Sequence, residues 1–309
     1  MAVHDGAAHI AATIASIVAQ EAVAIELIVV DDASTDATPS ILAGYAASDP
    51  RIRVLRNPVN EGLTRSLATA CAVARAPFIA RHDSGDLSLP SRLRKERAVL
   101  VESPGVALVS CWTEFVGPEL ERLYVVRGAQ TAEREPVHII DLTMPSGVKD
   151  GPTHHGSAMF RADVYAASGG YRPQFYYSQD WDLWFRIAER GKFHMLPEVL
   201  YRARVTPSSI STTARTRQEE YGQLARNALV ARQTGVDEAP ILAQAAALVP
   251  THTQSKKQRA LGSYFIGEAL RRNGDVRARD YLRRAAFDRP TLLRAWTRWL
   301  QSLLTTRRV

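Results

Sequence analysis

Two short apolar runs that each lead to an acidic segment constrain the fold of this chain more than any other feature. Residues 25–30 lead into DDASTD at 31–36, and residues 76–80 lead toward DSGD at 83–86. Runs of this length are typical of buried strands, and an open parallel sheet binds ligands at the carboxyl ends of its strands. Clustered carboxylates suit a hard divalent cation that bridges phosphates. The pattern therefore predicts one site for chemistry on a nucleotide diphosphate.

The first part of the chain alternates segments of helical and of strand periodicity. Helices are predicted at 10–20, 38–47, 64–74 and 90–101, and buried strands at 25–30, 52–55 and 106–111. Pro90 opens the fourth helix, because proline is favoured in the first helical turn. This alternation predicts an α/β fold with a mostly parallel sheet flanked by helices.

The second part of the chain changes character twice. A loop is predicted at 147–155, a short strand at 157–160 and a helix at 180–191. A polar stretch at 208–217 precedes four segments of helical period, at 218–234, 239–249, 257–273 and 276–287. We therefore predict a first domain of residues 1–213 and an all-helical C-terminal region of residues 214–309.

Charge is unevenly distributed along the 309 residues. The net charge is +7, but residues 256–309 hold fourteen Lys and Arg against four Asp and Glu, a net +10 that leaves −3 for the preceding part. This asymmetry points to an anionic partner of the C-terminal segment, either membrane headgroups or nucleic acid. No apolar run approaches the ~20 residues that a membrane-spanning helix needs. We therefore expect a cytoplasmic protein, with the inner face of the membrane as a candidate partner.

The last predicted helix, at residues 291–306, is amphipathic and basic. Its apolar face holds Leu292, Leu293, Trp296, Trp299, Leu300, Leu303 and Leu304, with Arg294, Arg298, Arg307 and Arg308 off this face or at its end. Such a helix can lie in a membrane interface. Alternatively, the apolar face packs on the preceding helical hairpin, and the sequence leaves both interpretations open.

Several motifs together resemble a known family. They are VVDDASTD at 29–36, RN at 56–57, NEGL at 60–63, DSGD at 83–86 with Pro90 and Arg92, and QD at 179–180 followed by LW. In this order they resemble the family 2 glycosyltransferases of GT-A fold, over about residues 1–213. The resemblance implies a Rossmann-like α/β fold and an inverting transfer of a sugar from a nucleotide-diphosphate sugar to a hydroxyl group. The acceptor would be a saccharide or a lipid-linked molecule in cell-surface glycan or glycolipid synthesis.

The resemblance also implies which residues bind the nucleotide. Asp32 takes the position of the residue that contacts the base, and the full expected set is Ala2, His4, Asp31, Asp32, Arg65 and Asp83. An alternative is that this stretch is only a turn in which Ser34 or Thr35 caps the following helix. Only Ala2-Val3 remains of the family's first strand, so we expect the natural start of the chain to lie upstream.

The metal site expected from the resemblance departs from the family pattern. The usual motif is Asp-x-Asp-Asp, and Pro90 sets the register so that Gly85 stands where an aspartate normally contacts the metal. Asp83 and Asp86 remain to hold Mg²⁺ or Mn²⁺, together with diphosphate oxygens and water. Thr206 replaces a histidine that is frequent in the family, which weakens the expected site further. Alternatively, Asp83 and Asp86 only cap the helix near Pro90.

Asp180 matches the catalytic base of the family, with Gln179 in place of the usual preceding acid. We expect its carboxylate to be exposed at the start of a helix, while Asp182 faces elsewhere. His155, Gln179 and Trp181 are expected to line the donor and acceptor pocket. A plain helix-terminal charge is the alternative for Asp180.

Two other functions remain open. Gly85, Thr206 and the short first strand suggest a degenerate member that binds a nucleotide sugar without turnover. The basic tail alone suggests a helical scaffold or a nucleic-acid-binding protein, but the sequence has no recognised nucleic-acid motif, so we expect no nucleic-acid partner.

Overall fold

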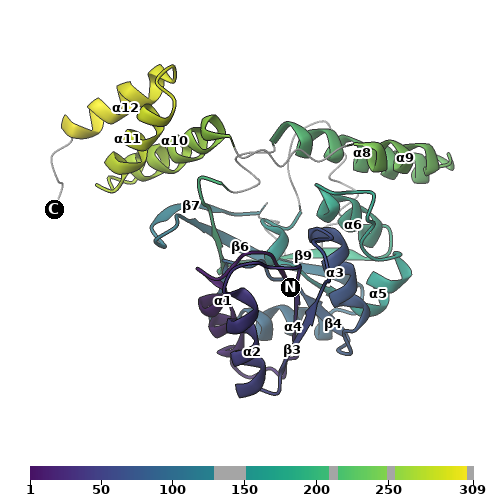
Figure 1. Ribbon diagram of the computed structural model, residues 1–309. Coiled ribbons are helices and arrows are strands. Elements are labelled where there is room, and N and C mark those ends of the chain that lie inside the picture. Colours follow the sequence, from purple (N-terminus) through teal and green to yellow (C-terminus); the bar gives the residue numbers. More distant parts are fainter. Residues whose placement is uncertain (129–150, 209–214, 249–254, 305–309) are drawn as a thin grey trace. The chain divides into compact units, whose positions relative to one another are not determined.

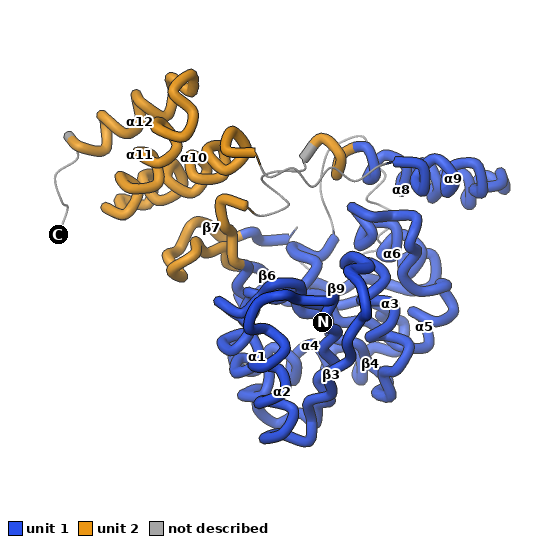
Figure 2. The backbone as a smooth tube through the Cα atoms, viewed as in Figure 1, with its two compact units in different colours: residues 1–113, 126–203, 220–249 blue, residues 114–125, 204–219, 250–309 orange. Residues whose placement is uncertain are grey.

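The computed structural model describes residues 1–128, 151–208, 215–248 and 255–304 (Figure 1). The chain folds into two compact units (Figure 2). The first unit holds residues 1–113, 126–203 and 220–249, and the second holds residues 114–125, 204–219 and 250–309. Among the described residues, no helix combines the length and the apolar character that crossing a membrane requires.

A three-stranded parallel sheet begins the first unit, in the order β1 (Ala2–Val3), β2 (Leu27–Asp31) and β3 (Ile52–Arg56). Helices α1 (Ile10–Val18), α2 (Thr38–Ser48) and α3 (Leu63–Ala72) flank it (Figure 1). Successive side chains of a strand point to opposite faces. Leu27 and Val29 accordingly pack in one cluster with α1 and α2, and Ile28 and Val30 pack in another with α3. Because both faces are covered, all of β2 is buried and reads as a continuous apolar run.

A second sheet has the order β4-β8-β6-β9-β5, with β7 paired to β6. Its strands are β4 (Phe78–Ala80), β5 (Leu87–Ser88), β6 (Val106–Val116), β7 (Arg122–Val126), β8 (Met159–Arg161) and β9 (Lys192–Arg204). The pairs β4–β8, β6–β8 and β5–β9 are antiparallel. The parallel arrangement expected from the alternation therefore holds for the first sheet and not for these pairs. The sequence prediction missed β5, β7 and β9. β5 and β9 form by pairing distant segments, such as Leu87 with Arg202, whereas β7 pairs with the preceding strand β6.

Helices α4 (Arg92–Glu102), α5 (Ala162–Ala167) and α6 (Gln179–Ala188) accompany the second sheet. Leu183, Trp184 and Ile187 of α6 join the same buried cluster as Phe160 of β8. Their spacing places them on one helical face. This packing holds the first turn of α6, and with it Gln179 and Asp180, against the sheet.

The C-terminal helices are α8 (Arg215–Thr234), α9 (Ala239–Ala247), α10 (Lys256–Arg272), α11 (Ala278–Asp288) and α12 (Leu293–Leu304). The compact units do not follow the boundary predicted at residue 213, because residues 220–249 belong to the first unit. Tyr221 of α8 is buried and its ring contacts those of Phe175 and Tyr177. In the second unit, α10, α11 and α12 pack around Ile266, Leu282 and Ala285.

Candidate active site

The segment after β1 is tied to the segment after β2. Asp5 Oδ1 accepts a hydrogen bond from the backbone N–H of Thr35 at 2.7 Å, and the N–H of Gly6 donates to Thr38 Oγ1 at 2.9 Å. His4 Nδ1 lies 2.8 Å from the carbonyl oxygen of Asp32. These bonds join the two strand ends into one rim. His4, expected to bind nucleotide, therefore lies beside the acidic pair.

Asp32 is buried and organises the turn that precedes α3. Its carboxylate accepts hydrogen bonds from Asn57 Nδ2 at 2.7 Å and from the N–H groups of Glu61 and Gly62, both at 2.8 Å. Three of its roughly four lone-pair sites are thus occupied. Gly62 has φ +86°, a conformation that glycine adopts without strain. The NEGL motif is therefore the partner of Asp32, and the base contact expected for Asp32 stays a prediction.

Asp31 is also buried, and its two oxygens differ in their surroundings. Oδ1 accepts a hydrogen bond from the N–H of Ser34 at 3.0 Å, whereas Oδ2 has an ion-pair partner in Arg56 Nε at 3.4 Å. α2 begins after Ala37, and the side chain that bonds its start is neither Ser34 nor Thr35 but Asp36, whose Oδ1 accepts from the N–H of Thr38 at 2.9 Å. The acidic segment therefore bonds both the strand ends and the start of the helix.

Ala2 and Arg65, two of the three remaining residues expected to bind nucleotide, lie at different positions. Ala2 is buried in the core cluster that includes Ile28 and Val30. Arg65 is exposed on the first turn of α3. Nucleotide binding by Ala2 and Arg65 stays a prediction.

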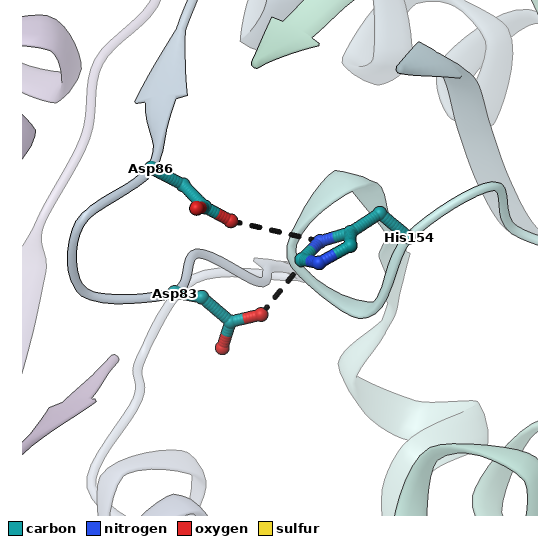
Figure 3. A group of neighbouring side chains, drawn as sticks. All are labelled: Asp83, Asp86 and His154. Atoms are coloured by element: carbon teal, nitrogen blue, oxygen red, sulfur yellow. Dashed lines mark ion pairs between the residues drawn. The ribbon is translucent and has the colours of Figure 1, made fainter. Parts of the chain in front are cut away.

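Asp83, Asp86 and His154 form a cluster with the chemistry of a metal site (Figure 3). One donor atom from each residue lies within 4.8 Å of the others. His154 Nδ1 is 3.6 Å from Asp86 Oδ2 and 3.8 Å from Asp83 Oδ2. Two carboxylates and an imidazole fit a divalent cation such as Mn²⁺. His154 lies in the predicted loop and was missed by the sequence prediction.

Groups around the cluster fix its charge and orientation. Tyr201 Oη on β9 donates to Asp86 Oδ2 at 2.8 Å and accepts from the N–H of Asp83 at 3.1 Å. Burial alone would raise the pKa of Asp83, but the adjacent Arg81 guanidinium and the neighbouring histidines outweigh it and lower that pKa. Burial lowers the pKa of His154, which favours the neutral imidazole that binds metals. Arg81 and Tyr201 have no sequence signal of their own.

The backbone conformation at residue 85 explains why glycine stands there in place of the family's aspartate. Gly85 has φ +97°, outside the range that residues with a side chain readily adopt, and its N–H donates to Thr13 Oγ1 at 3.0 Å. The structure does not support the alternative that Asp83 and Asp86 cap the next helix, because α4 begins after Ser91 and the N–H of Leu93 in its first turn donates to Gln20 Oε1 at 3.0 Å. Thr206 lies in the second compact unit, where its hydroxyl is 3.1 Å from that of Ser208.

His155 is buried and faces inward. Arg81 Nε donates to His155 Nε2 at 3.2 Å, and Tyr171 Oη lies 2.7 Å from the same nitrogen. Burial first, and then the Arg81 charge, lower the pKa of His155 well below its usual value. A neutral His155 therefore positions Arg81, which in turn contacts Asp83. Pocket lining by His155 stays a prediction.

Asp180 lies in the first turn of α6, between buried Gln179 and half-buried Trp181. Its Oδ1 accepts a hydrogen bond from the N–H of Trp181 at 2.9 Å. Contrary to expectation the carboxylate is not fully exposed, and burial raises its pKa to about 6, with the Asp83 charge also raising it. A carboxylate with such a pKa is suited to general base catalysis near neutral pH.

Asp182 faces away from Asp180, as expected. It is buried, pairs with Arg186 one turn later and lies 3.7 Å from Arg172 Nη1. Arg172 Nη2 also donates to Glu238 Oε1, next to α9, at 2.7 Å. Ion pairs therefore join the α8–α9 part of the first unit to the helix that carries Asp180.

Comparison with known proteins agrees with these features. The family described as Glycosyl transferase family 2 matches residues 1–166. EpsE of Bacillus subtilis, named as a glycosyltransferase, is 35% identical over 208 residues, which cover 66% of this chain and 71% of EpsE. The succinoglycan biosynthesis protein ExoO of Rhizobium meliloti is 41% identical over 100 residues, covering 32% of this chain and 28% of ExoO.

Two solved structures share the fold at low sequence identity. TarS of S. aureus, in complex with UDP-GlcNAc, has a TM-score of 0.55 at 16% identity, covering 97% of this chain and 87% of that one. Mannosyltransferase PcManGT from Pyrobaculum calidifontis, in complex with GDP-Man and Mn²⁺, has a TM-score of 0.54 at 20% identity. The match covers 98% of this chain and 83% of that one. The α/β GT-A-like fold expected from the motifs, with the C-terminal helices expected from the helical periodicity, is confirmed.

Proposed function

Because this chain belongs to glycosyltransferase family 2, we propose that it is an inverting hexosyltransferase that moves a sugar from a nucleotide-diphosphate donor to an acceptor hydroxyl. The observation that carries the proposal is the cluster of Asp83, Asp86 and His154, in which one donor atom of each residue lies within 4.8 Å of the others. Asp83 belongs to the cation cluster, and its charge helps to raise the pKa of Asp180. We therefore assign the cation cluster, which would bind the sugar donor, and the base Asp180 to one site.

The donor side consists of Asp83, Asp86 and His154, which would hold Mg²⁺ or Mn²⁺. When bound, the cation supplies charge neutralisation for the diphosphate leaving group. Arg81 keeps Asp83 ionised, and Tyr201 orients Asp86. The rim formed by His4, Asp31 and Asp32 is the place for the nucleoside, because it lies at the carboxyl ends of the parallel strands.

The acceptor side depends on Asp180. Its carboxylate takes the proton of an acceptor hydroxyl while that oxygen attacks the anomeric carbon and the bond to the diphosphate breaks. Attack from the side opposite the leaving group inverts the configuration. With a pKa of about 6, Asp180 is mostly ionised at pH 7 and still basic enough to accept a proton. Gln179 and Trp181 flank it as candidate walls of the pocket.

The relatives suggest the biological setting. EpsE is named as a glycosyltransferase and ExoO as a succinoglycan biosynthesis protein, while the two structural relatives bind UDP-GlcNAc and GDP-Man. These names support a saccharide or lipid-linked acceptor in cell-surface glycan or glycolipid synthesis. The enzyme would act in the cytoplasm, peripherally on the inner face of the membrane.

The test is acceptor-dependent release of nucleoside diphosphate from a panel of UDP, dTDP and GDP sugars, with Mn²⁺, Mg²⁺ or EDTA. Release that requires acceptor and is lost in Asp180→Asn supports the proposal. Gly85 in the cation motif favours a second candidate, a nucleotide-sugar-binding protein without turnover. A donor that raises the melting temperature, with no release for any acceptor offered, would favour that second candidate.

A further inference from the structure

Helix α12 packs on α10 and α11 of the same unit through one narrow face and leaves a different apolar face largely uncovered. Ala295 and Ser302 are buried, and Arg279 Nε of α11 donates to the carbonyl oxygen of Ser302 at 2.9 Å. Trp299 reaches the cluster of Ile266 and Leu282. The alternative that this helix packs on the preceding hairpin is therefore true in part. The residues that pack are the small Ala295 and Ser302, together with Trp299.

Four other apolar residues of α12 form an outer stripe, of which Trp296 also packs against the buried cluster of Ala285 and Ala295. It consists of Leu293, Trp296, Leu300 and Leu303, spaced three, four and three residues apart, which places them along one side of a helix. Leu293, Leu300 and Leu303 are 75%, 55% and 48% exposed. Phe287 of α11 is 59% exposed, and its ring centroid lies 5.1 Å from that of Trp296, with the two rings tilted. Exposed apolar side chains in a contiguous group mark an interaction surface.

The charge around this outer stripe is strongly positive. Residues 256–304 hold twelve Lys and Arg and four Asp and Glu, a net +8. Each of the four carboxylates has a basic side chain within 4.0 Å, so the remaining charge of this segment is positive. Arg283 and Arg284, one turn before Phe287, are exposed, as is Arg294. A second copy of this surface would bring like charges together, which disfavours self-association.

We propose that the outer stripe, Phe287 with Leu293, Trp296, Leu300 and Leu303, inserts shallowly into a membrane surface rich in anionic lipids. The arginines attract the headgroups and the apolar side chains enter the boundary of the acyl chains. Trp296 suits that boundary. Tryptophan is enriched at membrane interfaces, because its ring is apolar and its N–H can remain in contact with water. The inference rests on the membrane location in the proposed function and is independent of the transfer chemistry.

Co-sedimentation of the full chain with phosphatidylglycerol-containing vesicles, and with pure phosphatidylcholine vesicles, tests the proposal. We expect at least tenfold tighter binding to the anionic vesicles at low salt, falling as salt is added. Leu300→Glu should weaken this binding about tenfold. Val276→Glu, at another exposed apolar position of the same unit, is the matched control. Arg283→Gln with Arg284→Gln should reduce the preference for anionic lipid.

Three results would overturn the proposal. They are a full chain that stays in the supernatant at low salt, equal binding by Leu300→Glu and Val276→Glu, and a dimer in light scattering that Leu300→Glu dissociates. Release of nucleoside diphosphate with a water-soluble acceptor is measured alongside. If that release is retained while vesicle binding is absent, only the membrane inference fails.

Discussion

Tyr201 Oη donates a hydrogen bond to Asp86 Oδ2 at 2.8 Å, although the two residues are 115 positions apart in the sequence. The same hydroxyl accepts from the N–H of Asp83 at 3.1 Å. One buried side chain of β9 therefore orients both ends of the DSGD motif. Residues that orient metal ligands typically change metal affinity 10- to 100-fold when removed.

Tyr201→Phe should weaken Mn²⁺ binding about tenfold or more, because Asp86 loses its donor while the ring still fills the same space. Titration of Mn²⁺ in the presence of the nucleotide measures the effect. Tyr45→Phe, which removes an exposed hydroxyl bonded to Ala11 on α1, is the control. Unchanged Mn²⁺ affinity in folded Tyr201→Phe would contradict this role.

His154→Ala should also weaken Mn²⁺ binding, since it removes the only nitrogen donor of the described cluster. His194→Ala, at a half-buried histidine of β9, is the matched control. Asp83→Ala should weaken the binding further. If substitutions of His154, Asp83 and Asp86 all leave Mn²⁺ binding unchanged, then arginine side chains, and not a cation, stabilise the diphosphate.

Gly85→Asp should not restore a stronger cation site. The φ of +97° at this position strains any residue with a Cβ, and such strain costs about 1–3 kcal/mol. No heavy atom lies within 4 Å of an added Cβ, so the cost comes from the backbone. Gly85→Ala should lose as much stability as Gly85→Asp in thermal melting. Tighter Mn²⁺ binding by Gly85→Asp without loss of stability would show that the loop can adapt.

Asp180→Asn should lower turnover ~10²-fold or more and leave donor binding nearly unchanged. For the wild type, kcat should fall as the pH drops through about 6, because protonation of Asp180 removes the base. The same raised pKa means that the ionised carboxylate disfavours the folded state at neutral pH. Asp180→Asn should therefore melt at or above the wild-type temperature at pH 8.

Asp182→Asn is the control for Asp180→Asn on the same helix. It leaves Arg186 buried beside a neutral partner, so it should lower the melting temperature. Turnover per folded molecule should change less than in Asp180→Asn. Turnover within a few-fold of wild type in Asp180→Asn would remove Asp180 from the role of base.

Glu238→Gln should lower kcat a few-fold with little change in the KM for the donor. Glu238 holds Arg172 and Arg232, both at 2.7 Å, and Arg172 in turn faces Asp182 on α6. Weaker pairing should loosen the helix that carries Asp180. Glu102→Gln, at an exposed position of α4, is the matched control. If Glu238→Gln lowers the melting temperature but leaves kcat unchanged, Glu238 has a role in folding alone.

Much of the first half of the fold could be predicted from the sequence, because the signals there are local. A continuous apolar run predicts a strand buried on both faces, and β2 is such a strand. Helix and strand periods alternate up to β3, and the acidic residues follow β2 directly. The sequence therefore determined the parallel sheet, the acidic rim at its carboxyl end and the family.

Tertiary structure alone decided which groups complete the site. His154 joins Asp83 and Asp86 from a segment with no periodic pattern, and Tyr201 reaches them from β9, whose antiparallel pairing with β5 is set by packing between distant segments. The half-buried state of Asp180 and the φ of Gly85 likewise depend on neighbours that are not adjacent in sequence. Local patterns specify the chemistry that a segment offers, whereas burial and partners exist only after the chain has packed.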